Sequence, residues 1–156
     1  MHNKITKILT VFLLTVTSGL FAFGVSAEAE QAAAEPASLY ERLGAWDGIS
    51  NVVADTIALH VKNPTISHYF KDTDLDKLHE HVTAFFAAGT GGPAKYAGRD
   101  MTSAHAGMGM SDEDFQSAVA DVLAAVKMNG LGEQEQADVK AILMSLKPAV
   151  MGTAGS

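Results

Sequence analysis

Three histidines are the residues of this chain best suited to bind a metal. His105 stands in "GRDMTSAHAGMGM", just before a turn rich in glycine and methionine, and His79 and His81 stand two residues apart in "KLHEHV". Imidazole is a standard axial ligand of haem iron, and the macrocycle needs an apolar slot beside it. The spacing is compatible with a haem site, but also with histidines that serve as hydrogen-bonded polar groups at helix edges.

The chain contains no cysteine. Disulfide bonds and attachment of haem through thioether links are therefore excluded. No catalytic dyad or triad unrelated to a metal is visible in the sequence, so the residues alone leave open whether the protein is an enzyme.

The first 27 residues have the features of a secretory signal peptide. A basic start, "MHNKITK", precedes the apolar run "ILTVFLLTVTSGLFAFGV" and the small residues "VSA" before Glu28. An uncleaved membrane anchor is the alternative, because about 18 apolar residues can just span a bilayer. The small residues at the end of the apolar run and the polar stretch after them favour cleavage by a signal peptidase. We therefore expect a periplasmic or secreted protein that has no membrane contact after cleavage.

The rest of the chain is long enough for one domain with one core. We expect a flexible linker over 28–37, a domain over 38–150 and a disordered tail over 151–156. Without the signal peptide the chain keeps nine basic and 18 acidic residues. This negative charge makes nucleic acid and anionic membranes poor partners. We expect a monomer.

Apolar residues recur at three- and four-residue spacing along most of the domain, and no stretch alternates as a strand would. The pattern predicts an all-α fold. The apolar faces of its main helices are expected at residues 49–61, 75–86, 115–126 and 139–150. Asp47, Thr73 and Ser111 precede the first three of these as candidate caps. Residues 89–110 are glycine-rich and too long for an ordinary connection between helices, which indicates that they wrap around something.

Four motifs, in this order, resemble the group I truncated haemoglobins: "SLYERLG", "HYF" at 68–70, "FFAAGTGGPAKYAGRDM" and "AHAGMGMSDEDF". The resemblance covers nearly the whole domain without a gap. It implies a two-on-two α-helical sandwich around haem, in which the segment before the proximal histidine is mostly loop. The "LGAWDG" corner departs from the family, which usually has a glycine pair where this chain has Gly44 and Ala45.

The resemblance also assigns site residues. It places His105 at the position of the proximal iron ligand and Phe70 at that of the aromatic residue wedged against the haem face. Tyr96 and Lys77 match positions that often contact the haem propionates. The remaining haem-lining positions are Leu78, Val82, Phe86, Met101, Met110, Phe115 and Val119. A proximal imidazole needs an acceptor for its other ring N–H, and the sequence does not identify it.

The side expected to face a bound gas lacks the usual hydrogen-bond donors. Relatives that hold oxygen tightly commonly carry a tyrosine and a glutamine where this chain has Ile57 and Val82, and neither of these can donate. Each missing donor costs about 1–3 kcal/mol, roughly ten- to hundredfold in affinity. We therefore expect weak stabilisation of bound oxygen.

His81 matches the position at which cyanobacterial and algal relatives place a histidine that binds iron as sixth ligand. It could instead donate to a bound ligand or face solvent. Periodicity alone does not separate it from His79, because the two lie on opposite margins of the apolar stripe; the resemblance favours His81. His60 is expected to make a polar contact between helices. Relatives with covalently linked haem use a histidine on the last helix, and none follows His105 here, so non-covalent haem b is expected.

Three functions are compatible with this assignment. The first is reversible binding of oxygen, nitric oxide or carbon monoxide. The second is electron transfer, or redox chemistry on peroxide, nitric oxide or nitrite, by a bis-histidine haem served by an electron-donor protein. The third is a nitric oxide dioxygenase or peroxidase side activity, which the missing donors weaken because dioxygenation needs bound oxygen.

Overall fold

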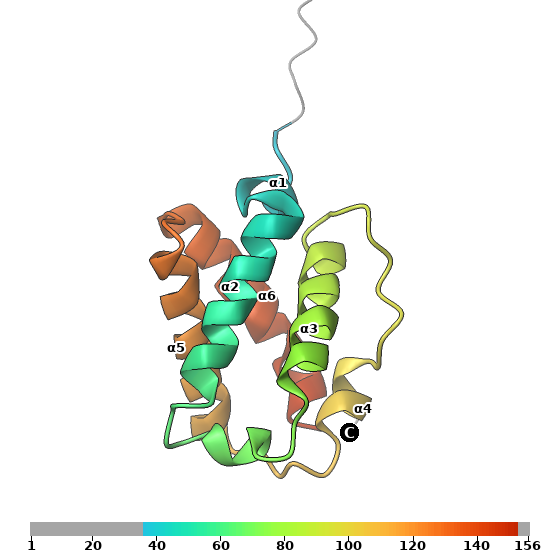
Figure 1. Ribbon diagram of the computed structural model, residues 1–156, viewed down its shortest axis with the longest axis vertical. Helices are drawn as coiled ribbons and strands as arrows, with labels where there is room; N and C mark the ends of the chain where they lie inside the picture. Colours follow the sequence, from blue (N-terminus) through green and yellow to red (C-terminus); the bar gives the residue numbers. More distant parts are fainter. Residues whose placement is uncertain (1–35, 153–156) are drawn as a thin grey trace, which may run out of the picture. The chain divides into compact units, whose positions relative to one another are not determined.

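Six α-helices and one 3-10 helix make up residues 36–152, the part of the chain that this computed structural model describes (Figure 1). They are α1 (Leu39–Arg42), α2 (Ala45–His60), η1 (Ser67–Phe70), α3 (Leu75–Gly89), α4 (Met101–His105), α5 (Asp112–Met128) and α6 (Glu133–Val150). No strand occurs within these residues, so the predicted all-α class is confirmed. The predicted signal peptide, most of the linker and the end of the tail lie outside them.

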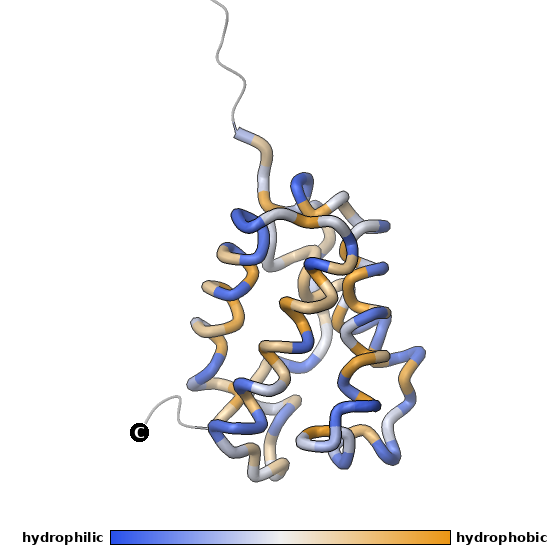
Figure 2. The backbone as a smooth tube through the Cα atoms, turned by 90° about the vertical axis from the view of Figure 1, so that its left-hand side faces the viewer, coloured by the Kyte–Doolittle hydropathy of each residue, from blue (hydrophilic) through white to orange (hydrophobic). Residues whose placement is uncertain are grey.

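The body of the domain consists of the four longest helices, α2, α3, α5 and α6. α2 packs against α3 and α5, and α6 packs against α5 and the short helix α4. Figure 1 shows α2 and α3 side by side, with a long loop that leaves the end of α3 and runs back along it to α4. Apolar and polar residues alternate around each helix (Figure 2), because each buries one face and leaves the other in water. None of the helices in 36–152 is both long and apolar enough to cross a membrane.

The core lies where α2 crosses α3 and α5. Ala87 and Ala125 are wholly buried, and their small side chains let the helices approach closely. Larger apolar residues fill the space around them, chiefly Ile49, Val53, Val126 and Val139. At these positions the apolar stripes of the sequence therefore face the interior.

The beginnings of the helices differ in part from those predicted. Ser111 caps α5 in a capping box with Asp114, as expected. The N-cap of α3 is Asp74 and not Thr73, because the Asp74 carboxylate accepts from the backbone N–H of Lys77. The expected irregular segment 89–110 contains the short helix α4, so His105 lies on a helical turn rather than in a loop.

The corner between α1 and α2, where the usual glycine pair is missing, has two residues in the left-handed region. α2 begins at Ala45, two residues before the predicted cap Asp47. Gly44 and Ala45 both have positive φ values, 86° and 55°, and this conformation is costly for an alanine. Gly48 has no room for a side chain, because a Cβ there would lie 2.1 Å from the carbonyl oxygen of Leu43.

A half-buried polar cluster joins the end of α2 to α5. The Nδ1 atom of His60 lies 3.0 Å from a carboxylate oxygen of Asp121, and the Asn63 amide donates to the same oxygen at 2.8 Å. Asn63 also donates to the hydroxyl of Ser117 at 2.9 Å. The expected polar contact of His60 between helices is thus present. Burial lowers the pKa of His60, and the hydrogen bond with Asp121 opposes this effect.

Replacing Ile49 should measure how much the core contributes to stability. Ile49 is 2% exposed, and Ile49→Ala should lower the free energy of unfolding by about 2–5 kcal/mol, because it removes buried methyl groups and leaves a cavity. Met128 is 63% exposed and provides the control: Met128→Ala should change the free energy of unfolding by less than about 0.5 kcal/mol. Chemical denaturation of both variants checks this. Equal effects would contradict the assignment of Ile49 to the core.

The buried His60 should make stability depend on pH. Its pKa in the folded chain lies below the unfolded value of 6.5, so the unfolded chain binds the proton more readily. The free energy of unfolding should therefore fall as the pH drops below about 6.5, and this contribution should be constant above it. Urea denaturation without added haem between about pH 7.5 and 5.5 tests this. His60→Gln should flatten the dependence, and an unchanged slope in that variant would refute the explanation.

Candidate haem site

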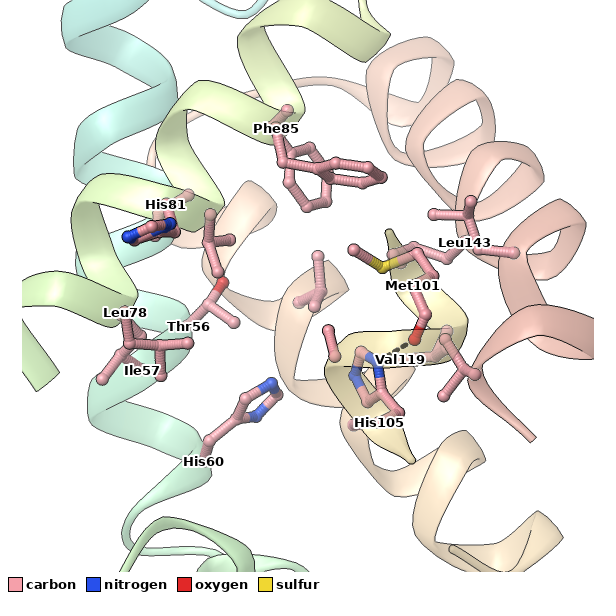
Figure 3. Close-up of a pocket in the computed structure, with 18 of the residues that line it drawn as sticks. Thr56, Ile57, His60, Leu78, His81, Phe85, Met101, His105, Val119 and Leu143 are labelled. Atoms are coloured by element: carbon pink, nitrogen blue, oxygen red, sulfur yellow. Dashed lines mark hydrogen bonds between the residues drawn. The ribbon is translucent and has the colours of Figure 1, made fainter. Parts of the chain in front are cut away.

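A cavity of about 580 Å³ opens between α2, α3, α4, α5 and α6 (Figure 3). Its volume lies within the range of roughly 300–1,000 Å³ that small-molecule and cofactor pockets occupy. Its wall is mostly apolar. The wall includes every residue that the sequence assigned to haem or iron: Phe70, Lys77, Leu78, His81, Val82, Phe86, Tyr96, Met101, His105, Met110, Phe115 and Val119.

His105 is held in one orientation by its own helix. Asp100 caps α4 by accepting from the backbone N–H of Ser103 at 3.0 Å. One turn later, Nδ1 of His105 lies 2.9 Å from the carbonyl oxygen of Met101, the dashed line in Figure 3. A carbonyl oxygen can only accept, so Nδ1 carries the proton and Nε2 keeps the lone pair that binds a metal. The acceptor that the sequence did not identify is therefore a backbone carbonyl four residues earlier.

The two histidines of α3 have different surroundings. Nε2 of His79 lies 3.0 Å from the backbone oxygen of Ser50 and 3.2 Å from its hydroxyl, so this ring is engaged with α2. His81 lines the cavity, whereas His79 does not, and the side chain of His81 is exposed to solvent. Of the two, only His81 is therefore positioned to reach a group in the cavity.

The wall contributed by α2 and α3 is apolar where a hydrogen-bond donor would be needed. Ile57 is buried, and Leu78 and Val82 are half-buried, and none of the three can donate. Sequence reasoning did not assign some polar residues of the wall to the site, among them Thr56, His60 and Arg99. Two features of the sequence could have placed these residues in the cavity wall. His60 lies on the inward stripe of its helix, and Arg99 belongs to the "GRDM" motif.

The loop that leads to α4 is fastened beside the cavity by aromatic contacts. The ring of Tyr96 lies edge-on to that of Phe85, with 5.2 Å between the centroids. The Tyr96 hydroxyl donates to the carbonyl oxygen of Arg99 at 2.9 Å, closing the turn before α4. Lys77 pairs with Asp74 at 3.1 Å, and both are exposed. Arg99, together with Lys77 in its pair with Asp74, places cationic groups at the exposed part of the cavity wall, where they suit the carboxylates of a ligand.

These features fit haem in their chemistry. The cavity offers one imidazole nitrogen with a free lone pair, an apolar enclosure for a macrocycle, and two cationic side chains in reach of solvent. Neutral imidazole whose other N–H is hydrogen-bonded is the usual form of a histidine that binds iron. Bound there, haem would supply iron that takes up small ligands or electrons.

Comparison with known proteins agrees with this geometry. The family model described as "Bacterial-like globin" matches residues 38–151. A group 1 truncated haemoglobin of Synechocystis sp. is 33% identical over 109 residues, which cover 67% of this chain and 88% of the relative. Another, of Mycolicibacterium paratuberculosis, is 28% identical over 123 residues, covering 78% and 90% respectively.

The fold also matches that of solved truncated haemoglobins. The crystal structure of the Tetrahymena pyriformis truncated haemoglobin in its Fe(III) form superposes with a TM-score of 0.68 at 26% identity, covering 74% of this chain and 97% of that one. The two-on-two helical sandwich that the resemblance implied is thus confirmed. This chain belongs to the bacterial-like globins and, within them, to the haem-binding group 1 truncated haemoglobins.

Proposed function

We propose that this protein holds non-covalent haem b through His105 and uses it to bind a diatomic gas, oxygen, nitric oxide or carbon monoxide, reversibly. The observation that carries the proposal is the hydrogen bond from His105 Nδ1 to the Met101 carbonyl, which leaves Nε2 available on an apolar cavity wall. Phe70, Phe115 and Val119 line the same cavity and would pack against the macrocycle. Lys77 and Arg99 would attract the propionates.

Oxygen should be held weakly by the α2 and α3 wall. A bound oxygen molecule with partial negative charge is stabilised by hydrogen-bond donors, and the positions assigned to them carry Ile57 and Val82. The loss of about 1–3 kcal/mol for each missing donor favours fast release over storage. Nitric oxide dioxygenation needs oxygen to stay bound, so it would be at most a side activity.

A bis-histidine haem is the second candidate, and the position of His81 supports it. His81 lies on the cavity wall on α3, while His79 is engaged with Ser50. With imidazoles on both sides, the iron would keep six ligands in both oxidation states, which suits electron transfer with a donor protein or redox chemistry on peroxide, nitric oxide or nitrite.

We further propose that the protein acts as a monomer in the periplasm or outside the cell. The basic and apolar segments of residues 1–27 and the small residues after them support export. Without residues 1–27, the chain has nine more acidic than basic residues, and this negative charge argues against binding to nucleic acid.

Replacing His105 tests the haem assignment. His105→Ala should abolish or strongly shift the Soret band after reconstitution with hemin, because the nitrogen ligand is lost. His68→Ala is the matched control, since His68 is exposed and does not line the cavity, and its spectrum should match the wild type. Visible absorption titrations with hemin measure both variants. A His105→Ala spectrum identical to the wild type in position and intensity would overturn the proposal.

Replacing the two α3 histidines separately tests the second candidate. The wild type should show six-coordinate, low-spin spectra in the ferric and ferrous states. His81→Ala should give five-coordinate, high-spin ferrous iron, whereas His79→Ala should keep the low-spin spectrum. Absorption and resonance Raman spectra distinguish the two states. A high-spin, five-coordinate ferrous wild type would remove the bis-histidine candidate, and a transition caused only by His79→Ala would show that His79 is the ligand.

A further inference from the structure

The cavity contains a second imidazole with a fixed proton, and neither proposed function uses it. His60 is the last residue of α2, three residues after Ile57, and its side chain is 13% exposed. Its ring lies 5.4 Å from that of Phe70, centroid to centroid, and it lines the cavity. Figure 3 shows His60 and His105 entering the same interior from α2 and α4. His60 is thus a titratable group in the wall of a mostly apolar pocket.

Asp121 determines the tautomer of His60. A carboxylate can only accept, so the 3.0 Å contact between its oxygen and Nδ1 of His60 requires the proton on Nδ1. Burial lowers the pKa of His60, which favours the neutral ring. Nε2 then carries a lone pair, and no group within residues 36–152 hydrogen-bonds to it. Neutral His60 therefore offers the cavity a base, not a hydrogen-bond donor.

The carboxylate also prepares His60 to accept a proton. Asn63 donates to the same Asp121 oxygen at 2.8 Å, which keeps the carboxylate in place. A protonated His60 would form an ion pair with Asp121 at a distance already set, so the new charge would be compensated inside the protein. A histidine oriented by a carboxylate is a common arrangement for general acid–base chemistry.

The other titratable groups of the wall are engaged elsewhere or lie in solvent. Besides His105 they are Tyr69, Asp74, Lys77, His81, Tyr96 and Arg99. The hydroxyl of Tyr69 donates to Asp114 at 3.0 Å, and Asp74 pairs with Lys77. His60 is therefore the half-buried group best placed to exchange a proton with a small molecule.

We propose that His60, held by Asp121, is the acid–base residue of this pocket and selects small weak acids as ligands. A molecule HX, such as hydrogen cyanide, hydrogen sulfide or hydrogen peroxide, enters neutral through the apolar cavity. The H–X bond breaks, its electron pair stays on X, and the proton moves to Nε2 of His60. X⁻ would then be available as a ligand to ferric haem held by His105, and no electron would be transferred. The proposal rests on the proposed haem function.

Cyanide binding tests the proposal in hemin-loaded ferric protein. The His81→Ala background keeps a second imidazole from competing. At neutral pH, where cyanide is present as the acid, His60→Gln should slow cyanide association at least about tenfold, because glutamine cannot take the proton. Asp121→Asn should slow it less. Above the pKa of hydrogen cyanide, where the ligand enters already deprotonated, His60→Gln and its parent should bind cyanide at the same rate.

Carbon monoxide provides the control for a merely structural effect. It carries no proton, so His60→Gln should leave its association with the ferrous protein within about twofold of the parent. Stopped-flow absorption measures both ligands. Cyanide association within twofold of the parent at neutral pH would overturn the proposal, and so would an equal slowing of cyanide and carbon monoxide.

A measurement without haem separates this proposal from the haem assignment. Nitrogen NMR of the imidazole rings in protein without hemin should show His60 protonated on Nδ1 and unprotonated on Nε2, and Asp121→Leu should abolish this preference. The reverse tautomer in the wild type would refute the proposal even if hemin bound normally. A protein that gave no Soret band would instead refute the haem function, and the tautomer would still be decided.

Discussion

The bond between the Nδ1–H of His105 and the carbonyl oxygen of Met101 determines which ring nitrogen can bind a metal, and the rest of the site depends on it. The bond exists because α4 completes one helical turn between the two residues, and Asp100 starts that turn by capping it. A histidine on a loop could turn its ring over or exchange its tautomer. On α4 the same side chain has one donor already satisfied and one lone pair left for a ligand.

The cavity combines an apolar lining with two imidazoles fixed by different acceptors. A neutral carbonyl holds His105, and a carboxylate holds His60. A carbonyl fixes the proton without adding charge, which suits a permanent bond to a metal. A carboxylate also stabilises the protonated ring, which suits a group that gains and loses a proton. The same side chain type can therefore serve two purposes in one pocket because the atoms behind it differ.

Helical periodicity was sufficient to predict the fold class, and the family resemblance was sufficient to predict twelve residues of the cavity wall. The sequence pattern was insufficient where a tertiary contact decides the outcome. Periodicity alone does not separate His79 from His81, because they lie on opposite margins of one stripe, whereas the contact of His79 with Ser50 does. α2 begins earlier than its cap residue indicated, because Gly44 and Ala45 adopt positive φ values and Gly48 passes close to Leu43. α4 is too short to produce a periodic signal.

A cavity of about 580 Å³ inside so small a domain also ties the lifetime of the protein to its cofactor. Buried core residues such as Phe115, Val119 and Val122 form part of the cavity wall, so a macrocycle between them becomes part of the hydrophobic core. A ligand that binds only the folded chain stabilises it by about 1.4 kcal/mol for every tenfold excess over its dissociation constant. The amount of protein that survives proteolysis would then rise and fall with the haem supplied to its compartment, and abundance itself would record cofactor status.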